Sequence, residues 1–154
     1  MEKKFYDVIV AGGSVSGLLC AREIARSGLS VLVLEEDSEI GTPEHCGGLV
    51  SLQAMEKLGI IPSSRSIVHC IEKAKISSAS KSFDINIKHD KLIVLDRREF
   101  DKQIAFQAQK SGAEIVTRNL VTTINYDSLE KKFGIRTTNC SFSSDLFVDA
   151  RGIS

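Results

Sequence analysis

A glycine-rich turn near the start of the chain contains the residues best suited to chemistry. Residues 10–18 read VAGGSVSGL. In the pattern G-x-G-x-x-G, the first glycine makes a tight turn, the second lets the backbone approach a pyrophosphate, and the third lets a helix pack against a strand. Aligned on the end of the preceding apolar run, these roles fall to Gly12, Ser14 and Gly17. The spacing predicts a dinucleotide-binding turn in which the middle glycine is replaced.

Serine is the least intrusive replacement at the middle position of the turn. Its side chain is small, and its hydroxyl can donate a hydrogen bond to a phosphate oxygen. The backbone amides at the start of the following helix still favour an anion. We therefore expect the site to be modified but not abolished. The residues that we assign to the cofactor here are Gly12, Gly13, Ser14, Val15, Ser16 and Gly17.

An acidic pair follows the next apolar run. Glu35 ends that run 23 positions after Gly12, close to the roughly 20 expected for a carboxylate that binds a ribose diol. The alternative interpretation is a solvated charge at a strand end. A 2'-phosphate is disfavoured, because it would meet this negative charge and no arginine follows immediately. We therefore assign Glu35 and Glu36 to the cofactor and expect NADP to be the least favoured dinucleotide.

The elements around the turn form a βαβ unit. Residues 5–11 are a mostly apolar run that stops at glycine, as a buried parallel strand does. Residues 15–27 repeat apolar side chains at helical spacing before Gly28, and SVLVL follows as a second buried strand. A glycine turn alone has purely conformational explanations. Its position between a strand and a helix favours a nucleotide site in an α/β, Rossmann-like fold.

The remainder of the chain alternates between helical and β-rich segments. Residues 49–58 predict a short helix, and residues 67–95 are short β-rich segments separated by polar turns, which predicts a small antiparallel insertion. Asp96 and Glu99 have capping-box spacing at the start of a helix that Gly112 ends, and four strand-like segments follow. We predict one domain over residues 1–154, with a parallel sheet flanked by helices.

Composition and charge exclude several classes of partner. The chain has 154 residues, and its 20 basic and 20 acidic side chains cancel, so nothing predicts a nucleic-acid partner. The four cysteines are widely separated, which predicts reduced thiols and neither a metal site nor a disulfide framework. No run is long enough to span a bilayer, and the N-terminus makes a poor signal peptide. We expect a cytoplasmic protein, with a peripheral position at the membrane as an open alternative.

Five segments in order resemble the N-terminal part of the geranylgeranyl reductase family of FAD-dependent oxidoreductases, which is related to the flavin monooxygenase fold. They are DVIVAGGSVSGL (7–18), VLVLEE (31–36), GTPEHCGGLVS (41–51), DRREFD (96–101) and LFVDARGIS (146–154). The resemblance implies that the cofactor is FAD. Family members continue for more than as long again, so it also implies that the C-terminal substrate and cap part of the family is absent.

The resemblance assigns further residues to the cofactor. It implies that Arg97 starts a helix and reaches the ribityl or pyrophosphate region, where a guanidinium pairs well with phosphate. The other interpretation of Arg97 is an exposed arginine in the first turn of a helix. Val121 matches a strand position whose backbone contacts adenine. Ala150 and Gly152 match a turn beside the flavin, and Arg151, at the variable position between them, has no role in the pattern.

The segment PEHCGG matches a family loop that lies near the isoalloxazine and the lipid chain being reduced. Cys46 is the candidate catalytic residue, and Gly47 and Gly48 would let the backbone approach a flat ring closely. A small packed hydrophobe is an equally good interpretation of this cysteine. We expect His45 to be a solvated loop residue. His69 and His89 are interpreted as structural or surface residues.

Three hypotheses remain open from the sequence. The chain is the FAD-binding part of a prenyl reductase that acts on an isoprenoid lipid and is completed by a partner chain, or a non-catalytic nucleotide-binding module, or an NAD-binding domain that uses Glu35 for the ribose. Unpaired strand edges would favour association. We therefore expect a partner chain or a homo-oligomer in addition to a small-molecule cofactor.

Overall fold

The computed structural model describes residues 4–44, 46–87 and 91–152. His45 and His89, which the sequence placed on the surface or in structural roles, lie outside the described residues. The chain divides into two compact units. The first consists of Met1–Pro43 and Asp101–Ser154, and the second of Glu44–Phe100.

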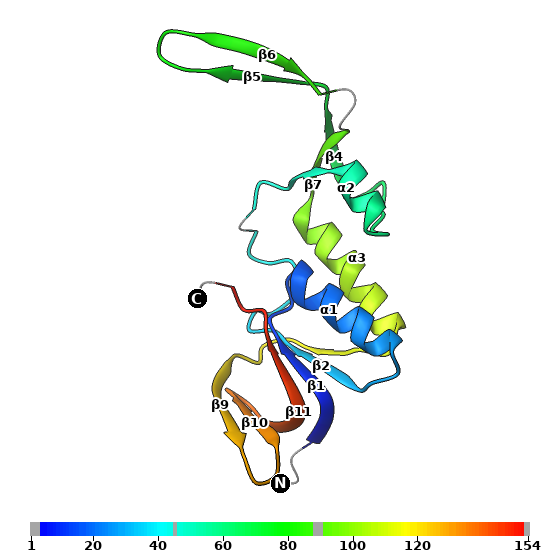
Figure 1. Cartoon of the computed structure of the whole chain (residues 1–154), viewed down its shortest axis with the longest axis vertical. Coiled ribbons are helices and arrows are strands. Elements are labelled where there is room, and N and C mark those ends of the chain that lie inside the picture. Colours follow the sequence, from blue (N-terminus) through cyan, green and yellow to red (C-terminus); the bar gives the residue numbers. More distant parts are fainter. Residues whose placement is uncertain (1–3, 45, 88–90, 153–154) are drawn as a thin grey trace. The chain divides into compact units, whose positions relative to one another are not determined.

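The first unit is built on a six-stranded mixed sheet with strand order β8-β2-β1-β11-β10-β9 (Figure 1). β8 (Glu114–Val116), β2 (Val31–Leu34), β1 (Lys4–Ala11) and β11 (Ser141–Asp149) are parallel neighbours. β10 (Lys132–Thr137) and β9 (Val121–Asp127) continue the sheet as antiparallel strands. The predicted βαβ unit and parallel sheet are confirmed, and β1 brings the glycine turn to the middle of the parallel part.

Helix α1 (Val15–Arg26) begins directly after the glycine turn. Its apolar residues Leu18, Ala21 and Ala25 recur at helical spacing and are buried, which is why this amphipathic segment packs against β1 and β2. The helix stops before Gly28, which has φ +86° and accepts the left-handed conformation that ends a helix. The guanidinium of Arg22 is buried and donates to Gln107 Oε1 at 2.8 Å.

Helix α3 (Arg97–Lys110) begins at the predicted cap. The Asp96 carboxylate accepts a hydrogen bond from the Glu99 backbone N–H at 3.0 Å, which satisfies one of the amides that a helix start leaves unpaired. Ile104 and Ala108 have no exposed surface, so the helix buries one apolar face. Gly112, with φ +107°, follows the last turn.

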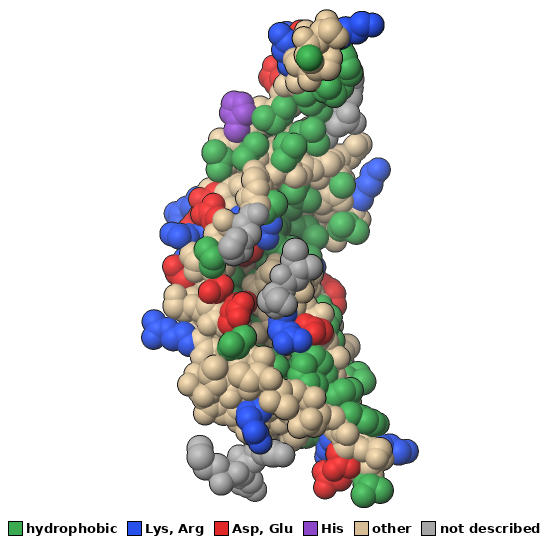
Figure 2. Space-filling view, turned by 90° about the vertical axis from the view of Figure 1, so that its left-hand side faces the viewer, with side chains coloured by type: hydrophobic (Ala, Val, Ile, Leu, Met, Phe, Trp, Pro, Cys, Tyr) green, Lys and Arg blue, Asp and Glu red, His purple; other side chains and the backbone are tan. Residues whose placement is uncertain are grey.

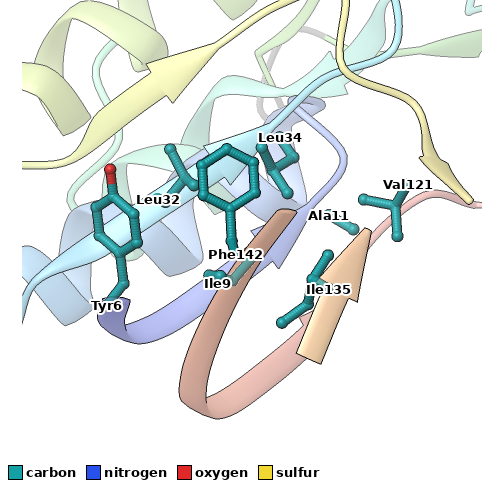
Figure 3. Packing of buried hydrophobic residues seen from close by; sticks show 8 residues of the cluster. All are labelled: Tyr6, Ile9, Ala11, Leu32, Leu34, Val121, Ile135 and Phe142. Carbon is teal, nitrogen blue, oxygen red and sulfur yellow. The ribbon is translucent and has the colours of Figure 1, made fainter. Parts of the chain in front are cut away.

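A cluster of buried side chains unites the strands of the first unit (Figure 3). These residues come from five of the six strands, and each buried aliphatic or aromatic side chain contributes about 1.5–3 kcal/mol to stability. The parallel strands and the antiparallel β9–β10 pair therefore share one core. The members of the cluster are Tyr6, Ile9, Ala11, Leu32, Leu34, Val121, Ile135 and Phe142.

The second unit contains two small antiparallel sheets, as the sequence predicts. β3 (Leu49–Ser51), β7 (Leu92–Leu95) and β4 (Ile67–Ile71) form one sheet, in the order β3-β7-β4. β5 (Lys73–Ser77) and β6 (Ser82–Asn86) form a separate hairpin.

The predicted helix over residues 49–58 is shorter in the structure. Its first three residues form β3, because they pair with β7 across more than forty residues of sequence, and α2 covers only Leu52–Lys57. The single-domain prediction for residues 1–154 stays a prediction. In the part of the chain that the structure describes, no helix combines the length and apolar character needed to cross a membrane.

Candidate functional site

The candidate site begins where β1 ends and the chain turns sharply at Gly12. This residue has φ +105°, and a side chain here would overlap the carbonyl oxygen of Ala150. Two backbone hydrogen bonds of 2.8 Å fix the position: the Gly12 N–H donates to Leu34 O, and the Ala150 N–H donates to Ala11 O. Only glycine both adopts this positive φ readily and leaves room for the carbonyl of Ala150, so the role that the motif assigns to Gly12 has a direct structural cause.

Gly17 brings the start of α1 close to the end of β1. A Cβ atom at this position would overlap Gly12 O and would lie 3.3 Å from the Cβ of Ala150. The third glycine of the motif therefore permits close packing of the helix against the turn, as the sequence predicts. The first amides of α1 are thereby held next to the carboxyl ends of β1 and β11.

Ser14 is the N-cap residue of α1, and its side chain is exposed. It makes no capping hydrogen bond, and its Oγ lies 3.1 Å from Ser16 Oγ. The Ser14 carbonyl accepts the first helical bond, from Leu18 N–H at 2.9 Å. The first turn of α1 contains no acidic side chain. The serine side chain thus does not cap the helix, and the positive end of the helix dipole remains accessible to an anion.

Glu35 is attached to the turn itself. Its Oε2 accepts a hydrogen bond of 2.5 Å from the Gly13 N–H, and its Oε1 accepts one of 3.0 Å from the Asp37 N–H. A Cβ atom on Gly13 would lie 2.9 Å from Oε2 and 2.5 Å from Cδ1 of Ile40. The carboxylate is therefore oriented by two backbone donors, and each oxygen keeps a second lone pair for a hydroxyl. Glu36 is exposed beside it.

Asn119, which no motif in the sequence marks, holds the backbone of Glu35 in place. Its backbone N–H donates to Glu35 O at 2.8 Å, and its side chain accepts a hydrogen bond of 3.0 Å from the hydroxyl of Thr137. Both side chains are buried, with 7% and 5% of their surface exposed. A polar residue before an apolar strand gives no sign of burial, so no signal in the sequence identifies this pair.

The turn after β11 contains the residue that the motif left without a role. Arg151 donates from Nε and from one terminal nitrogen to the Asp149 carboxylate, at 2.9 and 2.6 Å. This bidentate pairing lowers the pKa of Asp149 from 3.8 to about 2. Ala150 lies against Gly12 as described above, whereas Gly152, with φ +83°, has open space around it. Arg151 therefore orders the strand end that borders the glycine turn.

Four predicted site residues belong to the second unit. Cys46 is exposed and its Sγ accepts a contact from the Gly48 N–H at 3.5 Å. Gly48 has φ +70°, and a side chain there would overlap Leu95 O, so its backbone approaches β7. Gly47 has nothing within 4 Å of a Cβ position. Arg97 is partly buried as the first residue of α3.

Within the first unit, the structure brings the glycine turn, Glu35 and Ala150 together. Val121, the first residue of β9, is 5% exposed and packs in the core cluster, and the predicted contact of its backbone with adenine stays a prediction. His69 lies exposed on β4 in the second unit. Among the residues that the structure describes, no three metal-ligating side chains gather at one point. The chemistry that this geometry supports is the binding of a dinucleotide by backbone amides and one carboxylate.

Comparison with known proteins agrees with that geometry. Residues 10–57 match the family of NAD(P)-binding Rossmann-like domains. The digeranylgeranylglycerophospholipid reductase 1 of Methanopyrus kandleri is 37% identical over 111 residues, which are 71% of this chain and 29% of that protein. This chain is homologous to part of the geranylgeranyl reductases. It spans about 30% of the length of the curated reductases that it matches.

Solved structures extend the similarity with the geranylgeranyl reductases to the fold. A geranylgeranyl bacteriochlorophyll reductase-like protein from Thermoplasma acidophilum has a TM-score of 0.86 and 26% sequence identity. The match covers 98% of this chain and 40% of that protein. The halogenase PltM, solved in complex with phloroglucinol and FAD, shares the fold with a TM-score of 0.72 at 19% identity, over 94% of this chain and 34% of the halogenase. The chain thus has a Rossmann-like fold, and residues 10–57 match a dinucleotide-binding family within it.

Proposed function

We propose that this chain binds FAD and is the cofactor-binding part of a reductase that acts on isoprenoid lipids. The observation that carries the proposal is the attachment of the Glu35 carboxylate to the Gly13 amide, beside a turn that admits no side chain at Gly12 or Gly17. This combination suits a ribose next to a pyrophosphate. The homology with the geranylgeranyl reductases supports FAD as the dinucleotide and a prenyl lipid as the substrate.

The residues present fit the adenosine and pyrophosphate parts of FAD. A pyrophosphate needs close backbone approach, which Gly12, Gly13 and Gly17 permit, and amide donors, which the start of α1 supplies. A ribose needs an acceptor for its hydroxyls, and Glu35 is held for that purpose by two backbone N–H groups. Bound flavin, once reduced, would supply a hydride to one carbon of a carbon–carbon double bond, and a proton added to the other carbon would complete the saturation.

Residues of the second unit enter the proposal through the family resemblance. We propose that Arg97 pairs with a phosphate oxygen of the cofactor, because a guanidinium is permanently charged and donates in a planar fork. We propose that Cys46, which is exposed, contacts the lipid or the flavin. Because the substrate would be a lipid, we also propose a cytoplasmic protein that works at the membrane periphery.

An NAD-binding module without reductase activity is the second candidate. Residues 10–57 match NAD(P)-binding Rossmann-like domains, and this region contains both the turn and Glu35. NAD presents the same adenosine ribose and pyrophosphate to these residues as FAD does. The two candidates therefore differ in which dinucleotide stabilises the fold.

The test is to incubate the purified chain with FAD, remove unbound ligand, and record the visible flavin absorption, with thermal unfolding measured in parallel in FAD and in NAD. We expect flavin to be retained and the melting temperature to rise with FAD, since a ligand that binds only the folded state stabilises it. Gly13→Ala should lose the flavin, because the added methyl group meets the Glu35 carboxylate. Gly134→Ala is the control and should retain the flavin, because there is space for its methyl group. Stabilisation by NAD alone would favour the second candidate, and no stabilisation by either would overturn both.

A further inference from the structure

Arg151, which the glycine motif leaves without a role, lies beside the turn itself. In the parallel register of β1 and β11, Asp149 pairs with Ala11, so the residues after β11 meet the residues after β1. The backbone nitrogen of Arg151 lies 3.0 Å from the position that a Cβ atom on Gly12 would take. The structure therefore holds an arginine next to the turn that we propose for a pyrophosphate.

The guanidinium of Arg151 is oriented by Asp149 and keeps donors that this pairing does not use. Its Nε and Nη2 atoms donate to the two carboxylate oxygens at 2.9 and 2.6 Å. A guanidinium has five N–H donors, so about three are left after this pairing. Within the part of the chain that the structure describes, no other group accepts a hydrogen bond from this side chain. The side chain exposes 34% of its surface, so the remaining donors can reach a ligand.

The charges around the turn are mostly negative. Glu35 and Glu36 follow β2 on one side of β1, and Asp149 ends β11 on the other side. Residues 12–18 and 31–37 contain no Lys or Arg. A pyrophosphate bound at the turn would be repelled by these carboxylates, and a cation from another segment of the chain would offset that repulsion.

Arg151 interacts with carboxylates on both sides of the turn. Its pKa is raised, first by the hydrogen bonds to Asp149 and to a smaller extent by the charge of Glu36. Because β1 lies between β2 and β11 (Figure 1), the charge of Glu36 acts on the guanidinium from across the end of β1, where the glycine turn begins. Figure 2 shows acidic and basic side chains exposed at the height where Figure 1 has the end of β11.

We infer that Arg151 is a phosphate ligand of the dinucleotide site, and that its remaining N–H groups donate to the pyrophosphate that the amides at the start of α1 hold. The Asp149 carboxylate keeps the guanidinium in the orientation for this contact. Arginine suits both tasks, because its rigid planar fork can pair with a carboxylate and still present donors to a phosphate. The inference rests on the proposed function, since it adds a residue to the same site. It applies to FAD and to NAD alike, because both contain a pyrophosphate.

The test compares three substitutions that separate a phosphate ligand from a residue that only orders the strand end. Arg151→Gln removes the cation, whereas Asp149→Asn breaks the same ion pair and leaves the cation in place. Arg136→Gln is the control, because it removes an exposed cation of β10 that pairs in register with Ser141, at the opposite end of β11 from Asp149. The unaltered chain and each variant are titrated with FAD and ADP by calorimetry. Adenosine, which has no phosphate, is titrated by NMR.

We expect Arg151→Gln to weaken the binding of FAD and of ADP by about tenfold or more, because it loses charge-assisted hydrogen bonds to phosphate. Its adenosine binding should change by less than about twofold, since adenosine has no charge to pair with. Asp149→Asn should bind ADP at least as tightly as the unaltered chain, because a negative charge is removed and the guanidinium is released. Arg136→Gln should change none of the three affinities by more than about twofold.

Equal weakening of ADP binding by Arg151→Gln and Asp149→Asn would overturn the inference, and so would equal losses of ADP and adenosine binding in Arg151→Gln. Unchanged ADP binding by Arg151→Gln would also overturn it, while retention of FAD by the unaltered chain would leave the proposed function intact. Binding of no nucleotide by the unaltered chain would overturn both.

Arg151→Lys decides the case in which Arg151→Gln does not fold, since it keeps the charge and lacks the fork. It should bind ADP more weakly than Asp149→Asn does, because one ammonium group cannot pair with the carboxylate and the phosphate in the same geometry. Equal ADP affinities of these two variants would overturn the inference. Melting temperatures without ligand show which variants are folded.

Discussion

At the scale of single residues, Glu35 links the sequence motif to the geometry of the turn. Its carboxylate accepts hydrogen bonds from the Gly13 and Asp37 amides, so it holds the turn in place and remains able to accept from a ribose. The Ser14 hydroxyl, in contrast, lies within hydrogen-bonding distance of the Ser16 hydroxyl and does not cap the helix start. For the proposed binding of a dinucleotide, we therefore expect the replacement at Ser14 to be less important than the carboxylate of Glu35.

Glu35→Ala should weaken FAD binding by about tenfold or more, because hydrogen bonds to a charged group contribute about 1.5–3 kcal/mol. Ser14→Gly should retain or improve the affinity, since it restores the ordinary glycine at the middle position. Isothermal titration calorimetry with FAD measures both. Glu130→Ala, which removes an exposed carboxylate of the β9–β10 turn, is the control. The reverse ranking of Glu35→Ala and Ser14→Gly would contradict the alignment of the turn.

Asp149 should make stability dependent on pH in the acid range. Its pKa is about 2 in the folded protein because Arg151 pairs with it, against an ordinary 3.8. A lowered pKa stabilises the folded state above pH 3.8, and this contribution is lost as the pH falls toward 2, because the unfolded chain binds the proton first.

As the pH is lowered through this window, the melting temperature of Asp149→Asn should therefore fall less steeply than that of the unaltered chain. The side chain is half exposed, so added salt should reduce the difference between the two proteins. Asp145→Asn, which alters another carboxylate of the same strand, is the matched control. Identical pH profiles for Asp149→Asn and the unaltered chain would contradict the role given to the Arg151 pairing.

At the scale of elements, the junction of β1 and α1 is the most constrained part of the fold. Gly12 contacts Ala150 at the end of β11, and Gly17 contacts Gly12, so strand, turn and helix meet without room for a side chain. The β8–β9 connection adds a second constraint through the buried pair Asn119 and Thr137. These contacts fix the carboxyl ends of β1, β2 and β11 relative to one another.

Gly17→Ala should destabilise the chain by about 1–3 kcal/mol, because its methyl group would overlap the backbone of Gly12 and force the helix away from the turn. It should also reduce FAD binding. Urea denaturation, followed by circular dichroism, measures the free energy of unfolding. Gly134→Ala, whose Cβ position lies 3.9 Å from its nearest neighbour, should change that free energy by no more than about 0.5 kcal/mol. Equal effects of the two substitutions would contradict the packing described.

At the scale of the whole molecule, the two units contribute different parts of the proposed function. The first contains the glycine turn and Glu35, and the second contains Cys46 and Arg97. A hydride-transfer site must exclude water and orient both substrate and flavin, which is more than cofactor binding requires. Cofactor binding and hydride transfer are therefore tested separately.

The FAD-loaded chain alone should not saturate an isoprenoid lipid when its flavin is chemically reduced, whereas the whole digeranylgeranylglycerophospholipid reductase 1 of Methanopyrus kandleri, loaded and reduced in the same way, should do so. Mass spectrometry of the extracted lipid detects the added hydrogens. The matched controls are each protein without reductant and the lipid with reductant alone. Reduction of the lipid by the chain alone would show that these residues already form a complete site.

The sequence by itself determined the features of this protein that depend on residues close together in the chain. Side-chain periodicity and backbone preferences, which depend on residues close in the sequence, determine three features. These are the order strand, glycine turn, helix and strand, the cap of α3, and the antiparallel character of residues 67–95. The position of Glu35 at the end of β2 follows for the same reason. These features needed no knowledge of distant contacts.

Only the tertiary structure decided which distant segments meet. It placed Ala150 against Gly12, buried Asn119 beneath Glu35, paired Arg151 with Asp149, and turned Leu49–Ser51 from the predicted helix into a strand beside β7. Three of these four contacts join residues that are far apart in the sequence, so the residues beside each one do not indicate its partner. Arg151 and Asp149 are only two residues apart, but their pairing depends on the turn after β11. Strand pairing and burial are properties of the assembled chain, because the free energy comes from surfaces that only folding brings together.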